Sequence, residues 1–363
     1  MAKTMKAWRL HGYGDRRFDE IPIPEVKPGW VLVKVKVVQA SIGELGGRSE
    51  GMPHPSKAIE DKMLAEGKPI THGHEFCGEV VEVGQGVTRF KVGDRVGYRP
   101  VSVPCGECSM CLAGKKSQCL SPLEIPGAFA EYVCMPEDAG LIKAPDGPTD
   151  NEVAAFQPIA SGVGQVRPAD IQMGDSVVVL GQGAMGMGVL QLAKLAGAGL
   201  LIAVDVRPEV LDISRQYGAN IVINSREVDP VQEVMRATGG AGADIVFEAA
   251  GGRAKDGLAG FQTVQQALQM VRKEGKVVQV ANLEGSMEID PSFMKRRGIT
   301  YLFPGGFTAE DLEYVAFLVA SGRVKVAPQL SHVLYGFDKF PEAAEISLNK
   351  AKHRATNSAQ IVL

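Results

Sequence analysis

Several features that would place the chain in a special class of protein are missing from its 363 residues. No stretch approaches the roughly 18 consecutive apolar residues of a membrane span, and the start, MAKTMKAWRL, lacks the apolar segment of a secretory signal peptide. There is no basic patch or acidic tail, and the formal net charge is −3. These absences predict a cytoplasmic protein that binds a small molecule, with no nucleic acid and no membrane as partner.

Cysteine is scarce: the chain has six, too few for a disulfide scaffold at this length. Four crowd into PCGECSMCLAGKKSQC with the spacing C-x2-C-x2-C-x7-C, namely Cys105, Cys108, Cys111 and Cys119. Four thiolates on one compact loop suit a closed tetrahedral zinc site, which contributes folding energy and leaves no position for substrate. An iron–sulfur cluster is the alternative, although the fourth cysteine lies farther along and no proline follows it directly. Cys77 and Cys134 stand alone and are predicted to be small buried residues.

The pattern of strand-like and helix-like segments predicts two domains, with the C-terminal segment returning to the first domain. Residues 1–155 contain short β runs such as VLVKVKVVQA, GEVVEVGQGV, GDRVGYRP and AEYVCMP, separated by Gly and Pro, which indicate a β-rich domain with long loops. Residues 156–298 alternate strand and helix patterns, from SVVVLG to KVVQVANL, which builds a parallel sheet covered on both faces by helices. Residues 299–363 hold a helical segment and short β pieces ending in AQIVL, and we expect them to rejoin the first domain.

Two segments of the first domain are expected to determine substrate choice. The loop from Gly46 to Ile70 is unusually long and contains the helical pattern PSKAIEDKMLAEG, so it could fold over a neighbouring cleft. Tyr98 and Arg99 lie on the segment that leads to the cysteine-rich lobe. Arg99 could bind an anionic substrate group through a bidentate contact, or it could be an ordinary surface arginine.

The strongest cofactor signal is VVVLGQGAMGMGVLQLAKLAG, in which three glycines follow an apolar strand and open a helix. The first permits a tight turn, the second lets a pyrophosphate approach the helix N-terminus, and the third allows close packing of helix and strand. The residues predicted to contact a dinucleotide here are Gly181, Gly183, Ala184, Met185 and Gly186.

Asp205 ends the next apolar run, LIAVDV, near the spacing of about 20 residues that accompanies this glycine motif. Its carboxylate would accept hydrogen bonds from a ribose 2′-hydroxyl and repel a 2′-phosphate, which favours NAD over NADP. Arg207 leaves the choice open, because its guanidinium could accommodate that phosphate or could simply be a solvated surface group.

Together, GHEFCGEVVEVGQGVTRFKVGDRV, the four-cysteine segment, the GQGAMG turn and the C-terminal return resemble the zinc-containing alcohol dehydrogenases of the medium-chain dehydrogenase/reductase family, particularly the sorbitol and threonine dehydrogenase branch. The resemblance covers essentially the whole chain. It implies an α/β fold with a GroES-like β-rich catalytic domain, a Rossmann domain with a doubly wound parallel sheet that binds NAD, and an active site in the cleft between them. It also implies a structural zinc on the four cysteines, a catalytic zinc held by three side chains, and a homo-oligomer, either dimer or tetramer.

The sequence departs from this family at the ligands of the catalytic zinc. Family members usually carry a cysteine within C-G-[ST]-D-x-H, the His-Glu of GHE, and a Glu or Cys just before a proline near the domain junction. His74 and Glu75 match the second element, but Ser41 stands where the cysteine belongs, Gly46 where the histidine does, and Gln157 in place of the carboxylate. A serine hydroxyl is not ionised near neutral pH and a glutamine offers only an amide oxygen, so both are weak zinc ligands.

Two interpretations of the altered site stay open. In the first, Glu75 swings toward a metal, or His72 or Glu44 replaces a missing ligand, and a catalytic zinc is retained. In the second, the same side chains form a hydrogen-bonding site in which His74, paired with Glu75, gives or takes a proton near neutral pH. A purely structural alternative is that His74 and Glu75 hold the loop between two strands.

Three functions are compatible with these residues. The leading interpretation is an NAD(H)-dependent oxidoreductase of a secondary alcohol, polyol or ketone, with an altered or absent catalytic zinc. The second is a zinc-independent reductase of a conjugated double bond, in which His74 donates a proton to the enolate. The third is a non-catalytic NAD-binding sensor protein, since an intact glycine motif beside altered zinc ligands is what such a protein would show.

Overall fold

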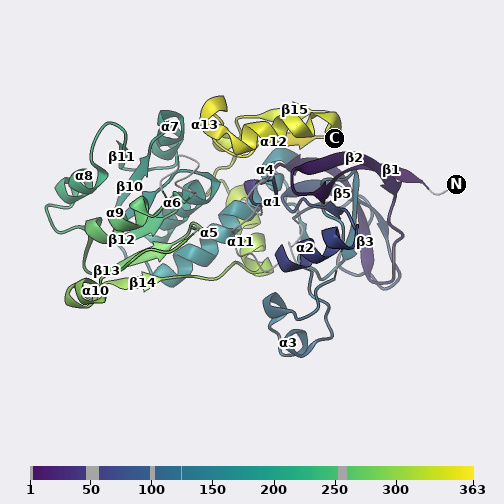
Figure 1. The fold of residues 1–363 in the computed structure, drawn as a ribbon, viewed down its shortest axis with the longest axis horizontal. Helices are drawn as coiled ribbons and strands as arrows, with labels where there is room; N and C mark the ends of the chain where they lie inside the picture. Colours follow the sequence, from purple (N-terminus) through teal and green to yellow (C-terminus); the bar gives the residue numbers. More distant parts are fainter. Residues whose placement is uncertain (1–2, 46–56, 99–102, 124, 252–259, 284) are drawn as a thin grey trace. The chain divides into compact units, whose positions relative to one another are not determined.

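The computed structural model describes residues 3–45, 57–98, 103–123, 125–251, 260–283 and 285–363 (Figure 1). The chain divides into two compact units. The first unit comprises Met1–Phe156 with Leu330–Leu363, and the second comprises Gln157–Gln329. Within the described ranges, no helix combines the length and the apolar character that crossing a membrane requires.

The first unit is β-rich, with one sheet of order β2-β1-β4 and a larger sheet of order β15-β16-β3-β5-β6-β8, in which β7 also pairs with β3. Its strands are β1 (Thr4–Gly12), β2 (Asp15–Pro22), β3 (Trp30–Gln39), β4 (Ile70–Thr71), β5 (Phe76–Val83), β6 (Arg95–Gly97), β7 (Tyr132–Pro136), β8 (Ile142–Lys143), β15 (Val333–Tyr335) and β16 (Gln360–Val362). Its helices are α1 (Ile42–Leu45), α2 (Lys57–Ala65), α3 (Ser109–Leu112), α4 (Asp150–Ala154), α12 (Phe340–Leu348) and α13 (Lys350–His353), with the single-turn helices η1 (Lys116–Gln118) and η4 (Phe337–Lys339).

Strand β3 is the centre of this unit. It pairs with β5 along one edge and with β7 and then β16 along the other, so its valines are covered by neighbours. Val31, Val33 and Val35 pack in a core with Phe76 and Phe129, and each is at most 1% exposed. The β runs singled out in the sequence are strands β3, β5, β6 and β7.

The second unit is a parallel sheet of order β11-β10-β9-β12-β13-β14 with helices between successive strands. Its strands are β9 (Ser176–Leu180), β10 (Leu200–Asp205), β11 (Ile221–Asn224), β12 (Ala243–Glu248), β13 (Val271–Gln279) and β14 (Thr300–Leu302). Its helices are α5 (Phe156–Ala169), α6 (Ala184–Ala196), α7 (Pro208–Gln216), α8 (Pro230–Ala237), α9 (Gln262–Met270), α10 (Pro291–Arg297), α11 (Ala309–Ala320) and η3 (Ala327–Gln329).

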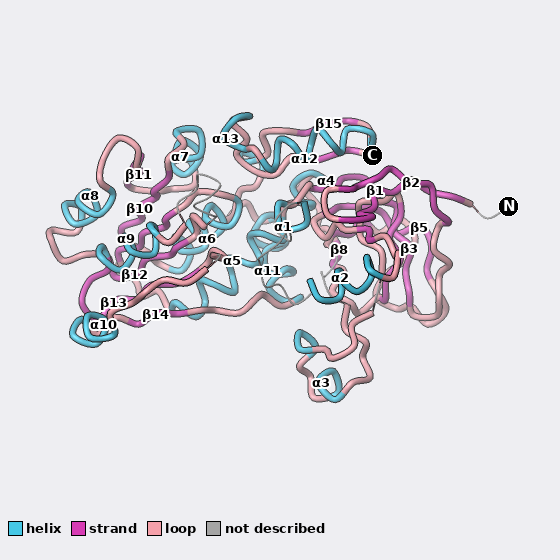
Figure 2. Tube along the Cα trace, in the orientation of Figure 1, coloured by secondary structure: helices cyan, strands magenta, loops and turns pink. Residues whose placement is uncertain are grey.

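This strand order is that of a Rossmann fold, in which ligands bind beyond the carboxyl ends of the strands where the order reverses. The reversal falls between β9 and β12. Figure 2 shows α6 on one side of β10 and α8 and α9 on the other. Cover on both faces explains why the β9 sequence, SVVVL, is continuously apolar rather than alternating.

The return to the first unit comes later than the expected residue 299. Strand β14 pairs with β13 and extends the parallel sheet, and α11 follows it within the second unit, so the return begins at Leu330. The last strand, β16, then pairs antiparallel with β3. A three-residue edge strand followed by a helix carries the same sequence pattern in either domain, which is why the boundary was misplaced.

The long loop of the first unit contains the expected helix, which is α2. The predictions that fall on Gly46 and Arg99 lie outside the described residues. Tyr98 is described, and its φ of 66° places a non-glycine residue in the left-handed region at the end of β6.

Candidate functional sites

The glycine-rich turn has the geometry that the sequence predicted. Gly181 follows β9 with φ 88°, and a Cβ there would collide with the backbone of Ala250. A Cβ at Gly186 would collide with the carbonyl of Gly181. At Gly183, the N-cap of α6, no atom of the described residues lies within 4 Å of the Cβ position. The turn therefore packs tightly on its inner side and leaves open the approach to the first N–H groups of α6, including those of Ala184 and Met185.

Asp205 lies at the carboxyl end of β10 and holds this turn in place. Its Oδ2 accepts from the Gln182 N–H at 2.7 Å, and its Oδ1 accepts from the N–H groups of Val206 and Arg207 at 2.8 and 3.0 Å. The Arg207 Nε lies 3.5 Å from Oδ1. A carboxylate has about four acceptor positions, so capacity is left for one ribose hydroxyl.

His74 and Glu75 lie on the loop between β4 and β5, whose backbone is fixed from both sides. Gly73 has φ 110°, and a Cβ there would collide with the backbone of Phe129. The Phe129 N–H donates to the His72 carbonyl at 2.7 Å. These constraints determine the direction in which the His74 side chain leaves the loop.

The His74 ring lies between two buried carboxylates. Its Nδ1 is 2.9 Å from Glu44 Oε2 and its Nε2 is 3.5 Å from Glu75 Oε1. Glu44, on the short helix α1, also accepts from the Gly73 N–H at 3.1 Å. The edge of the Tyr98 ring approaches His74, with 6.5 Å between ring centroids. A carboxylate oxygen therefore lies beside each ring nitrogen of His74.

Glu75 is held by hydrogen bonds from neighbouring polar side chains. The amide of Gln39, at the end of β3, donates to Glu75 Oε2, and Ser41 makes a second hydrogen bond to the same carboxyl group. Burial raises the pKa of Glu75 above its ordinary value, and the charge of Glu44 adds to the rise, whereas His74 and the two hydrogen bonds oppose it. The structure thus brings together three predicted residues, Ser41, His74 and Glu75.

Replacing Glu75 with glutamine should change how stability depends on pH. A raised carboxyl pKa stabilises the fold fully below the pKa of an unfolded glutamic acid, about 4.3, and that contribution is lost as the pH rises through the folded-state pKa. The melting temperature of Glu75→Gln should therefore rise relative to the unmodified protein between acid and neutral pH. Each unit of raised pKa is worth about 1.4 kcal/mol.

Glu79→Gln, on the strand β5 that directly follows Glu75, provides a matched control. The Lys36 ammonium holds the pKa of the exposed Glu79 carboxyl below its ordinary value, so the contribution of Glu79 is present above the unfolded pKa and is lost as the pH falls. The two variants should shift in opposite directions in calorimetric scans over pH. A difference for Glu75→Gln that does not change with pH would show that Glu75 titrates alike in the folded and unfolded states.

His72 belongs to a neighbouring cluster, which it forms with Glu60 and Arg16. Its Nε2 is 3.3 Å from Glu60 Oε1, on α2, and its Nδ1 is 3.2 Å from Arg16 Nη2. Arg16 also donates to the Glu44 carbonyl at 3.0 Å. This cluster fixes α2 and α1 against the loop that carries His74. These contacts engage both ring nitrogens of His72 and so do not favour it as a replacement metal ligand.

Over the described residues, the side chains around His74 are not arranged closely enough to be recognised as a metal site. Over the described part of the chain, the four-cysteine cluster is the only group of three or more His, Cys, Asp or Glu side chains close enough to share a metal. Ser41 is hydrogen-bonded to Glu75. Gln157 lies in the second unit at the start of α5, where its amide donates to the Ser161 hydroxyl at 3.0 Å. A hydroxyl and an amide are weak partners for zinc beside a single imidazole.

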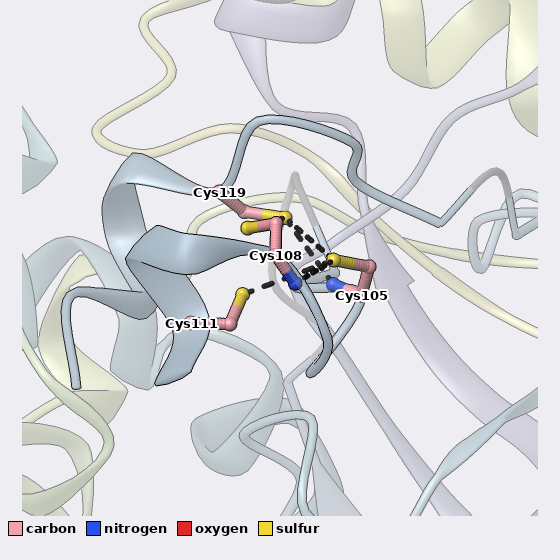
Figure 3. A group of neighbouring side chains, drawn as sticks. All are labelled: Cys105, Cys108, Cys111 and Cys119. Carbon is pink, nitrogen blue, oxygen red and sulfur yellow. Dashed lines mark hydrogen bonds between the residues drawn. The ribbon is translucent and has the colours of Figure 1, made fainter. Parts of the chain in front are cut away.

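The four cysteines of the lobe, in contrast, converge on one point (Figure 3). They lie on and beside α3 and η1, and their sulfur atoms are all within 4.8 Å of one another. The Sγ separations include 4.0 Å for Cys105 and Cys111, 3.9 Å for Cys108 and Cys119, and 3.5 Å for Cys105 and Cys119. Four ligands at about 2.3 Å from a tetrahedral zinc ion are separated by about 3.8 Å. The cluster therefore fits a closed zinc site.

Backbone N–H groups prepare this cluster for a cation. The hydrogen bond from the Leu120 N–H lowers the pKa of Cys108 to about 6, and the one from the Cys105 N–H lowers the pKa of Cys119. Burial raises the pKa of Cys111 to about 12. Thiolate is the form that binds metal, so a bound zinc ion would complete the deprotonation of the set.

Comparison with known proteins gives the same assignment for both units. The family model for the alcohol dehydrogenase GroES-like domain matches residues 27–146, and that for zinc-binding dehydrogenases matches residues 184–320. An uncharacterized zinc-type alcohol dehydrogenase-like protein of Escherichia coli K12 is 33% identical over 340 residues, 92% of this chain and 91% of that one. The sorbitol dehydrogenase of Bacillus subtilis 168 is 31% identical over 292 residues, 79% of this chain and 77% of that one.

Among solved structures, a Sinorhizobium meliloti 1021 protein with bound NADP is 26% identical, covers 99% of this chain and 100% of its own, and superposes with a TM-score of 0.79. The fold is thus a GroES-like β-rich unit and a Rossmann unit, as expected. The chain belongs to the zinc-type alcohol dehydrogenases of the medium-chain dehydrogenase/reductase family, and it is an oxidoreductase of that kind.

Proposed function

We propose that the protein is an NAD(H)-dependent oxidoreductase that transfers hydride between nicotinamide and a secondary alcohol, polyol or ketone, and that it does so without a catalytic zinc. One observation carries the proposal: the imidazole of His74 lies between the buried carboxylates of Glu44 and Glu75, beside Ser41, where the family implies a metal. The name of the sorbitol dehydrogenase relative supports the substrate class.

In this proposal the second unit binds the cofactor, which supplies the nicotinamide carbon that accepts or returns hydride. The open approach at Gly183 admits the pyrophosphate to the N-terminus of α6, where backbone N–H groups and the helix dipole favour negative charge. Asp205 accepts from one ribose hydroxyl with its remaining acceptor position.

In this proposal the first unit supplies the group that accepts the proton of the alcohol or returns it to the ketone. Glu44 lies 2.9 Å from Nδ1 of His74, so this pair fixes the ring orientation and stabilises the protonated imidazole. On alcohol oxidation, the substrate hydroxyl gives its proton to Nε2 of His74 while hydride leaves the carbinol carbon; in the reverse direction the same nitrogen protonates the carbonyl oxygen. Ser41 and Gln39 keep the Glu75 carboxyl in place beside that nitrogen. Such general acid–base catalysis is worth about 10²- to 10⁴-fold in rate.

A substrate panel tests the reaction. Purified protein should reduce NAD in the presence of at least one polyol or secondary alcohol, followed at the nicotinamide absorbance, and should reduce the matching ketone with NADH. Reduction of conjugated enones without any alcohol oxidation would favour a double-bond reductase. Binding of NADH without turnover of either class would favour a sensor protein.

Cofactor choice should depend on Asp205. NADH is expected to bind more tightly than NADPH, and Asp205→Ser should narrow the gap, because a hydrogen bond to a charged group contributes roughly 1.5–3 kcal/mol, about 10- to 100-fold in affinity. Fluorescence titration with both dinucleotides measures the two affinities.

Asp212→Ser serves as the matched control. Asp212 lies on α7 and forms an exposed ion pair with Arg215, and its substitution removes the same charge as Asp205→Ser does. It should leave the preference for NADH unchanged. Equal or tighter binding of NADPH by the unmodified protein would instead indicate that Arg207 binds the 2′-phosphate of NADPH.

A further inference from the structure

A second carboxylate, Glu248, occupies the point in the second unit where the strand order reverses. It is the last residue of β12 and is 0% exposed. Its Oε1 accepts from the N–H groups of Ala250 and Gly251 at 3.0 and 3.3 Å and from the Thr263 hydroxyl at 2.8 Å. A buried carboxylate needs such donors to offset its desolvation, and here three of them converge on one oxygen.

The other oxygen of Glu248 begins a chain that reaches the neighbouring strands. Oε2 accepts from the side-chain amide of Gln279 at 2.6 Å, and the side-chain Oε1 of Gln279 accepts from the Tyr301 hydroxyl at 2.6 Å. Burial and the charge of Glu248 raise the pKa of Tyr301 to about 12, which keeps the phenol protonated as the donor. This series of hydrogen bonds therefore links β12, β13 and β14 near their carboxyl ends.

The backbone that Glu248 holds is the wall against which the glycine turn packs. Ala249 N–H donates to the Leu180 carbonyl at 2.8 Å, directly before Gly181. Ala250 approaches Gly181 so closely that a Cβ there would collide with it. A shift of the Ala250 backbone would therefore displace the turn itself.

We propose that Glu248 is a positioning residue for dinucleotide binding. It fixes the glycine turn from the β12 side, as Asp205 fixes it from the β10 side through the Gln182 N–H. This proposal rests on the proposed cofactor role of the second unit, and it extends that role to Glu248, which acts through the backbone that it holds. The effect is transmitted through Ala250 and Gly181, so Glu248 acts on affinity for the dinucleotide and not on the proton chemistry in the first unit.

Titration of NADH by fluorescence tests the proposal in the full-length protein. E248Q keeps the shape of the side chain but replaces an acceptor with an amide donor, and it should raise the NADH Kd at least tenfold and the KM for NAD by a similar factor, with a smaller change in kcat. D244N is the matched control. Asp244 lies at the opposite end of the same strand and, like Glu248, accepts from a backbone N–H and a hydroxyl, here both of Ser176; it accepts in addition from the Arg272 guanidinium. It should lower the melting temperature without changing the Kd.

Two milder variants test the same series of hydrogen bonds if E248Q fails to fold. Y301F removes the terminal donor and T263V removes one donor to Oε1, and each should raise the NADH Kd about threefold, with D244N again as the reference. Equal NADH affinity in E248Q and the unmodified protein, or in both milder variants if E248Q does not fold, would overturn the role of Glu248. So would a loss of affinity in D244N as large as that in E248Q. Failure of the unmodified protein to bind NADH or NADPH would instead overturn the proposed cofactor role on which this inference rests.

Discussion

Replacing His74 with asparagine should lower kcat for alcohol oxidation by about 10²- to 10⁴-fold, the range of a lost general base. Asparagine can still hydrogen-bond Glu44, but it cannot accept a proton near neutral pH. Dinucleotide affinity should be unchanged, because the residues proposed to bind the cofactor all belong to the second unit. Steady-state kinetics with the best alcohol of the panel, together with NADH titration, measure both quantities.

His72→Asn is the matched control for this experiment. His72 is also a buried histidine with a carboxylate partner, two residues away on the same loop, but it faces Glu60 and Arg16. Its replacement should lower stability and change kcat far less than His74→Asn does. Equal losses of kcat in the two variants would mean that catalysis depends only on the conformation of this loop, and that His74 has a structural role.

Replacing Cys111 with serine should have the largest effect on stability. It removes one thiolate from a closed four-cysteine site, and metal binding by such sites is on the order of 10 kcal/mol in zinc peptides, although the rest of the first unit will retain part of that stability. The expected result is loss of the bound metal with a much lower melting temperature or insoluble protein. Elemental analysis and calorimetry measure the two changes.

Cys134→Ser tests whether this effect is specific to the lobe. Cys134 is a buried cysteine on β7, and its Sγ lies 3.8 Å from the Glu25 carbonyl oxygen, outside the cluster. This variant should keep its metal and lose little stability. A well-folded Cys111→Ser protein that keeps its metal but loses hydride transfer would show that the lobe has a catalytic role.

The parts of the structure that depend on local pattern could be predicted from the sequence. Alternating apolar strands and amphipathic helices specified the parallel sheet, because a strand covered on both faces must be apolar throughout. The spacing of the four cysteines specified their convergence, because only a short loop separates them. The glycine turn could also be predicted from the sequence, because Gly181 and Gly186 occupy positions where any Cβ would collide with the backbone.

The parts that depend on contacts between distant segments could not be predicted in this way. The sequence placed Glu44 among possible zinc ligands, but only the fold shows that it faces Nδ1 of His74. Gln39 gave no signal except as a polar residue at the end of a valine-rich strand, yet it donates to Glu75. Glu248 was not singled out at all, because its partners Thr263 and Gln279 are brought to it by the neighbouring helix and strand.

The zinc content of active protein tests the central claim most directly. The chain has one complete ligand set, that of the four cysteines, and lacks a second over the residues that the structure describes. We therefore expect about one zinc ion per chain, and brief treatment with a mild chelator should leave alcohol oxidation largely intact because the enclosed metal is structural. Two zinc ions per chain, with the second removed together with activity, would contradict the account and would make His74 a metal ligand.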